Sequence, residues 1–270
     1  MSRIKYGIDL GTTNSSIAVI EKGESVIVKS ELQKDTLPSC VAYSKKKTIS
    51  AGDRAFNQLQ KDKLISIKKG EVLSSNTFIE FKRTMGTDKK YHSTYMETDY
   101  LSEDLSAEVL KKLKSFPQED NFKSVVITIP AMFNDNQKAA TKKAAELAGF
   151  SQVELLQEPI AAAMAFGMDE KIQDGQIIIF DFGGGTFDVC LVNIEEGIMQ
   201  VKDTGGDNWL GGKNLDQAIV DEIMIPYLKE NYTIETYLND EGKSSLLKEA
   251  LKVEAEKIKI SSSAYFSESS

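Results

Sequence analysis

Two short segments of the chain, 172 residues apart, repeat one pattern of residues that could do chemistry. Residues 8–13 read IDLGTT and residues 180–186 read FDFGGGT. In each, an apolar strand ends in an aspartate, a glycine turn with a hydroxyl residue follows, and an apolar strand returns. The interval is too long for a solenoid repeat but suits a duplicated lobe of domain size. Two such lobes, facing one another, would place both turns in one cleft.

The two turns have the composition of a phosphate site. A glycine-rich hairpin turn directs several backbone N–H groups into one small concavity, where glycine permits close approach and threonine adds a hydroxyl donor. Asp9 and Asp181 stand just before the turns, where a carboxylate beside a phosphate is unfavourable unless a hard cation lies between them. The pattern therefore indicates a Mg²⁺–nucleotide site. One turn alone would equally suit an ordinary tight hairpin, and the second matched copy argues against that reading.

Two other nucleotide-binding motifs are absent from the sequence. A P-loop requires Gly-x-x-x-x-Gly-Lys-Ser/Thr, and the nearest approach, GGKN at residues 211–214, lacks both the spacing and the hydroxyl. A dinucleotide fingerprint, Gly-x-Gly-x-x-Gly, opens a helix, whereas the glycines at 183–185 precede the strand-like TFDVCL. The sequence therefore excludes both P-loop proteins and dinucleotide-binding proteins of the Rossmann type.

The elements that must position the turns alternate between strand and helix patterns, which predicts an α/β protein. Period-two and apolar runs predict strands at residues 4–10, 15–20, 26–28, 37–50, 124–130, 153–156, 176–182, 186–194 and 197–203. Helical spacing predicts helices at 53–59, 76–85, 106–113 with Ser106 as N-cap, 134–147, from 158, 214–231 and 243–262. The middle stretch resembles an inserted subdomain.

Composition narrows the class of protein. The chain has 270 residues, 41% of them hydrophobic and 27% charged, as in globular proteins. The net charge of -8, without a long basic block, argues against nucleic acid as a partner. No run approaches the ~20 apolar residues of a membrane span, so we expect no membrane partner and a cytoplasmic location. Cys40 and Cys190 are expected to be buried free thiols, and His92, the one histidine, a solvated loop residue.

Six ordered motifs resemble the nucleotide-binding domain of the seventy-kilodalton heat-shock chaperones, DnaK-type, over nearly all of the chain. They are GIDLGTTNS at 7–15, NT at 76–77 through KR at 82–83, IPAMFND at 129–135, EPIAAA at 158–163, FDFGGGTFD at 180–188 and LGG at 210–212. The resemblance implies the actin-like ATPase fold, with two lobes that each combine a ribonuclease H-like core and a peripheral subdomain. We expect lobe I at 1–172, with its core at 1–36 and 117–172 and its peripheral subdomain at 37–116. Lobe II is expected at 173–270, with its core at 173–212 and a partial peripheral subdomain at 213–270.

The resemblance also implies roles for individual residues. Lys82 would neutralise charge on the γ-phosphate and orient the attacking water, and Glu158 would position water near the metal. The implied catalytic set is Lys82, Glu158, Asp181 and Thr186. The implied metal set is Asp9 and Asp181, holding hydrated Mg²⁺, with Asp188 for the metal or for K⁺. The residues implied to bind ATP or ADP are Gly11, Thr12, Thr13, Asn14, Gly183, Gly184, Gly185, Thr186, Gly211, Gly212, Glu256, Lys259 and Ser263.

The last helix offers a separate check on the nucleotide site. Glu256, Lys259 and Ser263 are three and seven residues apart, so they share one helical face. In the family these positions meet the adenosine. Without the motifs, a solvated helix face would be the simpler interpretation.

Three features of the sequence depart from the family pattern. The segment between residues 86 and 106 is much shorter than is usual in the family, so we expect the first peripheral subdomain to lack a hairpin there. Glu154, Gln157 and Ile160 replace the usual residues of the surface that helps to dock the J-domain. The family's final adenosine loop, linker and peptide-binding domain have no counterpart. We therefore expect a shortened or degenerate relative that binds ATP more weakly than a whole domain and hydrolyses it slowly or not at all.

The function expected from the resemblance is an ATP-binding and ATP-hydrolysing domain of a molecular chaperone. Its partners would be the peptide-binding domain of the parent chain, a J-domain co-chaperone and a nucleotide exchange factor, with unfolded client proteins acting indirectly. Two alternatives stay open at this point. One is a metabolite kinase on the same superfold, and the other is a nucleotide-sensing interaction module without turnover.

Overall fold

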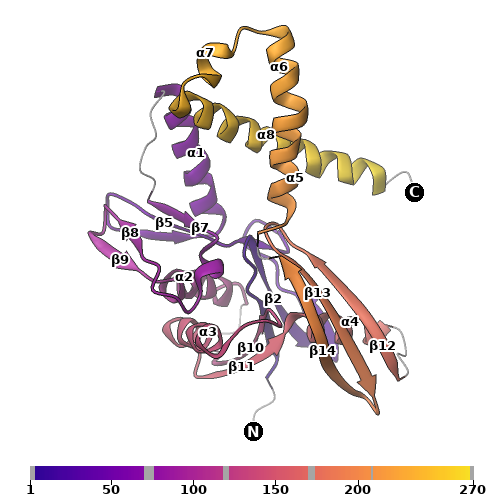
Figure 1. The fold of residues 1–270 in the computed structure, drawn as a ribbon. Coiled ribbons are helices and arrows are strands. Elements are labelled where there is room, and N and C mark those ends of the chain that lie inside the picture. Colours follow the sequence, from indigo (N-terminus) through magenta and orange to yellow (C-terminus); the bar gives the residue numbers. More distant parts are fainter. Residues whose placement is uncertain (1–3, 70–75, 118–121, 170–173, 208, 268–270) are drawn as a thin grey trace.

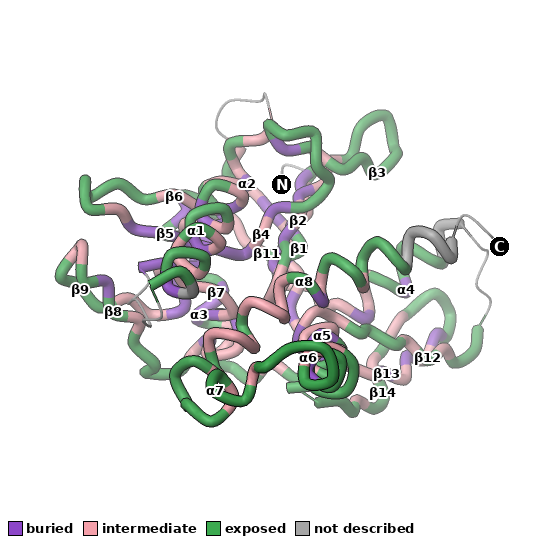
Figure 2. Tube along the Cα trace, turned by 90° about the horizontal axis from the view of Figure 1, so that it is seen from above, coloured by how far each residue is buried: buried purple, intermediate pink, exposed green. Residues whose placement is uncertain are grey.

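The computed structural model describes residues 4–69, 76–117, 122–169, 174–207 and 209–267. Two larger β-sheets lie side by side, helix α1 stands above a small third sheet, and α5 rises from the end of the second large sheet, with α8 reaching from α1 to α5 (Figure 1). The first sheet and its helices contain most of the buried residues, whereas the second sheet is largely intermediate or exposed (Figure 2). The two halves of the molecule are therefore unequally packed.

The first sheet has the strand order β11-β10-β1-β2-β3, and β4 pairs with the start of β2. Its strands are β1 (Tyr6–Asp9), β2 (Asn14–Glu21), β3 (Glu24–Ile27), β4 (Leu37–Pro38), β10 (Ser124–Ile129) and β11 (Gln152–Gln157). The three strands from the start of the chain pair antiparallel, whereas β1, β10 and β11 are parallel to one another. This arrangement places the end of β1, with Asp9, beside the end of β10.

Two helices, α2 (Ser102–Lys114) and α3 (Asp135–Leu147), pack against one another and against this sheet. Leu105, Val109 and Leu113 of α2 are fully buried in one cluster with Ile8 and Ile127 of the sheet. Side chains four apart on a helix share one face, which explains why this spacing forms the core.

The start of α3 agrees with the prediction from the sequence, but the start of α2 does not. Asn134 and Gln137 form a reciprocal capping box, with the Asn134 side chain accepting the Gln137 N–H at 3.0 Å. Helix α2 begins four residues before the predicted N-cap, because the Asp104 carboxylate accepts the Leu101 N–H at 2.8 Å. Ser106 is buried inside the helix, so its assignment as an N-cap is wrong.

A small sheet with the order β6-β5-β7 carries helix α1. Its elements are β5 (Cys40–Tyr43), β6 (Ile49–Ala51), β7 (Thr77–Ile79) and α1 (Asp53–Lys69). The helix predicted at 53–59 is confirmed and runs further. The helix predicted at 76–85 is wrong, because the β-branched and aromatic residues Thr77–Ile79 pair with β5. A 3₁₀ helix, η1 (Phe81–Thr84), follows after Glu80, which has a positive φ of 59°.

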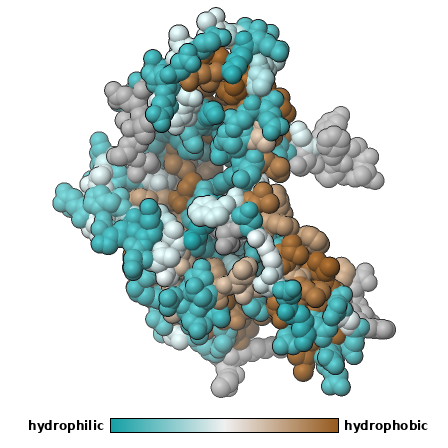
Figure 3. Space-filling view, viewed as in Figure 1, coloured by the Kyte–Doolittle hydropathy of each residue, from teal (hydrophilic) through white to brown (hydrophobic). Residues whose placement is uncertain are grey.

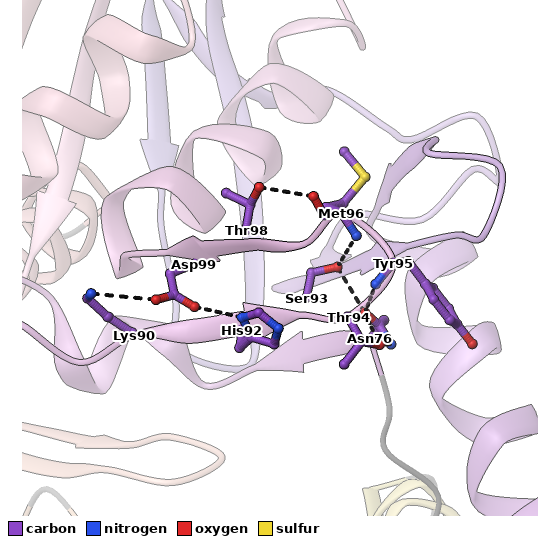
Figure 4. A network of polar contacts seen from close by, with 9 residues as sticks. All are labelled: Asn76, Lys90, His92, Ser93, Thr94, Tyr95, Met96, Thr98 and Asp99. Atoms are coloured by element: carbon purple, nitrogen blue, oxygen red, sulfur yellow. Dashed lines mark hydrogen bonds and ion pairs between the residues drawn. The ribbon is translucent and has the colours of Figure 1, made fainter.

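A hairpin of β8 (Tyr91–Ser93) and β9 (Thr98–Tyr100) occupies the segment expected to lack one. Figure 4 shows its polar contacts. His92 is exposed on β8, and its Nδ1 lies 2.7 Å from the Asp99 carboxylate on the opposite strand. The expectation of no hairpin was wrong because six residues of strand suffice when side chains from outside the hairpin support its turn.

Asn76 provides that support from just before β7. It is almost fully buried, and its Oδ1 accepts hydrogen bonds from the Ser93 hydroxyl at 2.9 Å and the Tyr95 N–H at 3.1 Å (Figure 4). Its Nδ2 donates to Thr94 Oγ1 at 2.8 Å. One amide therefore holds three consecutive residues of the β8–β9 turn.

We expect Asn76→Ala to destabilise the protein by about 2 kcal/mol, because it leaves buried donors of the turn without an acceptor. Urea unfolding followed by circular dichroism measures this change. Asn57→Ala, on the exposed face of α1, is the matched control and should have little effect. Equal stability of the two variants would show that the turn does not depend on Asn76.

The second sheet is an antiparallel meander of β12 (Gly175–Phe182), β13 (Phe187–Glu195) and β14 (Ile198–Asp207). Helix α4 (Glu158–Asp169) covers one face, where Ala163, Val192 and Ile194 are buried. The other face is apolar but exposed over Ile178, Phe180 and Phe182, and hydrophobic surface gathers over this sheet in Figure 3. Only the face of the sheet that packs against α4 is buried. The side chains along each strand therefore alternate between more buried and more exposed positions.

The remaining helices follow the second sheet. They are α5 (Gly212–Ala218), the π-helical turn η2 (Ile219–Met224), α6 (Ile225–Asn231), α7 (Glu235–Leu238) and α8 (Glu241–Ser267). Val220, Ile225 and Ala255 form their buried centre. Helix α8 contacts both α1 and α5, so it bridges the helix above the small sheet and the helix after the second sheet (Figure 1).

Two expectations from composition can be compared with the structure. Cys40 and Cys190 are buried and free, and burial raises the pKa of Cys40 to about 12. Neither thiol therefore has the character of a reactive thiolate. Among the described residues, no helix combines the length and the apolar character needed to span a membrane.

Candidate active site

The first glycine turn joins β1 to β2 and is held from outside by Ser39. The Ser39 N–H donates to the Thr13 carbonyl at 2.8 Å, and its hydroxyl donates to the Gly11 carbonyl at 2.7 Å. Ser39 and Ser15, whose hydroxyl lies 2.9 Å away, are both buried. The carbonyls of Gly11 and Thr13 are therefore both bonded by Ser39. Sequence analysis did not identify Ser39, since nothing in its local pattern distinguishes it from a loop serine.

The second glycine turn joins β12 to β13 and is held by the segment that starts α5. The Gly183 N–H donates to the Thr186 carbonyl at 2.9 Å, which closes the turn. The N–H groups of Gly212 and Lys213 donate to the carbonyls of Gly183 and Gly184 at 3.0 and 2.9 Å. The glycines at 211–212, although 25 or more residues along the chain from the turn, therefore lie directly against it.

The two turns contact each other. A Cβ atom on Gly184 would overlap the Thr13 side chain, so only glycine allows this approach. The Thr13 hydroxyl is buried and has no hydrogen-bond partner among the described residues. A phosphate oxygen is an acceptor that such a hydroxyl could bind.

Both turns line one cavity of about 630 Å³, a size typical of small-molecule sites. Twelve of the residues predicted for the site line it: Asp9, Gly11, Thr12, Thr13, Asn14, Lys82, Glu158, Asp181, Gly183, Gly184, Thr186 and Asp188. They come from both sheets, from η1 and from the start of α4. The predicted meeting of the two turns in one cleft is therefore confirmed.

We expect Gly184→Ala to lower kcat/KM for the ATP hydrolysis that the family resemblance implies by about 100-fold, because the added methyl group forces the turns apart on the scale of 1 Å. Steady-state kinetics measure the change. Gly7→Ala is the matched control, since a Cβ there would meet no atom within 4 Å. A similar loss in both variants would mean that the contact between the turns is unimportant.

Three aspartates line the cavity, and two of them, Asp9 and Asp181, occupy matched positions in the two hairpins. Asp9 pairs with Ser16 across the first hairpin, and Asp181 pairs with Asp188 across the second. Asp9 also accepts a hydrogen bond from the Thr128 hydroxyl at 2.8 Å. Burial, and then the charge of Asp181, raise the pKa of Asp188. The cavity therefore gathers negative charge that a cation would relieve.

These carboxylates do not form a direct coordination cage. In the described parts of the chain, no three side chains of His, Cys, Asp or Glu are grouped closely enough to hold a metal ion. Mg²⁺ commonly keeps several waters and uses one or two carboxylates together with substrate phosphates. The donor set of Asp9, Asp181 and Asp188 therefore fits hydrated Mg²⁺ held beside a nucleotide.

Lys82 and Glu158 form an ion pair in the wall of the cavity. Lys82 lies on η1 and is only 7% exposed, and its Nζ donates to Glu158 Oε1 at 2.8 Å. Its Nζ also lies 5.8 Å from the centre of the Phe133 ring. Burial raises the pKa of Glu158, while Lys82 acts in the opposite direction. Glu158 thus fixes the position of a buried ammonium group at the cavity wall.

The structure separates the residues predicted to meet adenosine. Glu256 lines a second cavity of about 230 Å³, which shares Thr12 and Thr13 with the first. Lys259 instead pairs with buried Asp216 at 2.6 Å and donates to the Gly212 carbonyl at 3.0 Å. The Ser263 side chain lies outside the described residues. Glu256 and Lys259 thus stand near the glycine turns, but Lys259 is engaged by protein groups.

Two of the three positions that depart from the family pattern share a groove. Gln157 and Ile160 line a hollow of about 430 Å³ with residues 199–204 of β14, and the Gln157 amide donates to the Ala131 carbonyl at 3.2 Å. Glu154 is exposed on β11. The groove therefore lies where the first sheet, α4 and β14 meet.

Residues 5–269 match the family described as Hsp70 protein, which covers nearly the whole chain. Members of this family are ATPases that generally bind ATP or ADP with Mg²⁺, and they have the actin-like ATPase fold of two lobes. The strand meanders, the paired turns and the shared cavity agree with that fold. The chain belongs to the Hsp70 family and is the ATPase domain of a heat-shock chaperone.

Proposed function

We propose that the cavity between the two glycine turns binds Mg²⁺–ATP and hydrolyses it to ADP and phosphate. The observation that carries this proposal is the convergence of both turns, three aspartates and the Lys82–Glu158 pair on one cavity. Turn N–H groups and the Thr13 hydroxyl would bind the β- and γ-phosphates. When bound, Mg²⁺ supplies charge neutralisation at the phosphates, and Asp9, Asp181 and Asp188 would hold it through water.

Each side chain would have a separate task in hydrolysis. Lys82 would stabilise the charge that develops on the γ-phosphate and orient the attacking water, and a buried ammonium acts strongly in such a site. Glu158 would keep Lys82 in place and accept a hydrogen bond from water on its free side. Thr186 would contribute a hydroxyl to the second turn. Glu256 would face the adenosine, and Lys259 would support this region through Asp216 and Gly212.

The division of the chain proposed from the sequence is compatible with these roles. Lobe I would span 1–172 and lobe II 173–270, with peripheral subdomains at 37–116 and 213–270. The phosphate turns would then belong to the two cores, whereas Lys82 and Glu256 would come from the peripheral subdomains. K⁺ near Asp188 and a cytoplasmic location are further parts of the proposal.

The partners are proposed from the family. Nucleotide state would be coupled to a peptide-binding domain, with a J-domain co-chaperone and a nucleotide exchange factor as regulators, within a DnaK-type stress response. The groove lined by Gln157 and Ile160 is the surface on which we would place the J-domain. Glu154 beside it would favour a partner that carries positive charge there.

ATP hydrolysis by the intact parent protein, with and without a J-domain and an unfolded peptide, tests this function. We expect phosphate release that requires Mg²⁺ and rises when both partners are added. Bound nucleotide without phosphate release would favour a sensing module. Transfer of the labelled γ-phosphate to a sugar would favour a metabolite kinase.

A further inference from the structure

Arg83, the residue after Lys82, reaches from the first half of the molecule to the second. Its guanidinium donates through one terminal nitrogen to the Gly185 carbonyl at 2.6 Å, and the other lies 3.3 Å from the Glu80 carboxylate. The Arg83 side chain is only 15% exposed and lines the same cavity as Lys82. The bond to Gly185 therefore connects η1 directly to the second glycine turn.

Trp209 packs on the other side of this arginine. The Arg83 guanidinium carbon lies 5.0 Å from the centre of the Trp209 ring, within the range of a cation–π contact. Trp209 follows β14, and its backbone N–H donates to the Asp207 carboxylate at 2.7 Å. The Trp209 side chain is otherwise largely solvent-exposed, and both Trp209 and Arg83 line the cavity.

A second contact, between Glu80 and Lys213, also links the two halves of the molecule. Glu80, at the start of η1, forms an ion pair with Lys213, which is the residue after the glycines that hold the second turn. Glu80 thus binds both Arg83 of its own segment and Lys213 of the other half. A planar guanidinium suits this combination, because it can bond a carbonyl and a carboxylate in its plane while an aromatic ring stacks on its face.

We propose that Arg83 is a positioning residue for ATP hydrolysis, and that Trp209 holds its guanidinium in place. Lys82 and Arg83 are adjacent on one short 3₁₀ helix, so the element that presents the catalytic ammonium is also tied to the turn that would hold the γ-phosphate. The Arg83–Gly185 bond then fixes the distance between Lys82 and that phosphate. This inference rests on the proposed function of the cavity.

The proposal predicts an effect on turnover that exceeds the effect on binding. In Arg83→Ala the phosphate turns and aspartates remain, so we expect the affinity for ATP to change by about threefold or less. Looser placement of Lys82 should lower kcat by about 10- to 100-fold, as misplacement on the scale of 1 Å does. Trp209→Leu should lower kcat by a smaller factor, and Trp209→Phe, which keeps a ring under the guanidinium, should restore most of it.

A fluorescence measurement tests the contact between Arg83 and Trp209 independently of ATP hydrolysis. Trp209 is the one tryptophan in the chain, so its fluorescence is free of other indoles. Because Arg83 covers one face of the ring, acrylamide should quench Trp209 more efficiently in Arg83→Ala than in the wild type. Arg54→Ala, at an exposed position of α1, is the matched control for both measurements and should leave them unchanged.

The outcomes are distinguishable. Wild-type kcat together with unchanged quenching in Arg83→Ala would overturn the proposal. Equal losses of kcat and affinity would also overturn it, because they would make Arg83 a binding or structural residue. If the wild type bound ATP without hydrolysing it, the ATPase assignment would fail. The quenching comparison would then still decide whether Arg83 and Trp209 stack.

Discussion

Lys82→Ala is expected to retain nucleotide binding and to lose hydrolysis by about 10²- to 10³-fold, because in the proposed mechanism the ammonium group would act mainly on charge that develops in the transition state. Lys82 is buried against Glu158 in the wall of the cavity. Its removal leaves the phosphate turns intact but withdraws the one lysine that lines this cavity among the described residues.

Single-turnover assays with γ-labelled ATP separate this effect from binding. Lys143→Ala is a matched control, since Lys143 pairs at 3.0 Å with the largely buried Glu103 outside the cavity. Each variant removes the lysine partner of a partly or largely buried carboxylate, Glu158 or Glu103. Any loss of stability from the unpaired carboxylate should therefore occur in both variants. Unchanged hydrolysis in Lys82→Ala would remove Lys82 from the mechanism.

Asp9→Asn and Asp181→Asn are each expected to weaken ATP binding by about 10- to 100-fold in Mg²⁺, as loss of a group that orients a metal-bound ligand does. Binding in EDTA should change much less, since each carboxylate would bind the hydrated metal ion and not the adenine base of the nucleotide. Asparagine retains the shape of the side chain, and at position 9 its carbonyl can still accept the Thr128 hydrogen bond.

Calorimetry with and without Mg²⁺ measures the two affinities. Asp99→Asn, in the exposed β8–β9 hairpin, is the control for a change of charge alone. Equal losses in Mg²⁺ and in EDTA would contradict a metal role for Asp9 and Asp181. A loss confined to Mg²⁺ would support the hydrated ion between the two hairpins.

The centre of the site was predictable because its signals are local in sequence. The aspartate, glycines and hydroxyl residue of each turn lie within seven residues, and hairpin geometry then fixes how they face the cavity. The repeat extends further than the motif. Asp188 stands opposite Asp181 as Ser16 stands opposite Asp9, so the sequence spacing already specified the strand pairing.

The surroundings of the site were not predictable, because they depend on contacts between distant segments. Ser39 holds the first turn from 26 residues along the chain, and Arg83 meets Gly185 from 102 residues away. Ser39 has no spacing pattern that distinguishes it from a surface residue, and the motif that contains Arg83 does not indicate a contact with Gly185. The predicted helix over 76–85 failed for a related reason, since the strand-favouring residues Thr77–Ile79 pair with β5, which lies much earlier in the chain.

Hydrogen–deuterium exchange with and without Mg²⁺–ADP tests the central claim most directly, because it reads each glycine turn separately. If one nucleotide binds between the two turns, the amides of residues 11–14 and 183–186 should become protected together, at the same ligand concentration, and this protection should weaken in EDTA. Protection of one turn without the other, or protection confined to residues outside the shared cavity, would contradict a site built from both turns.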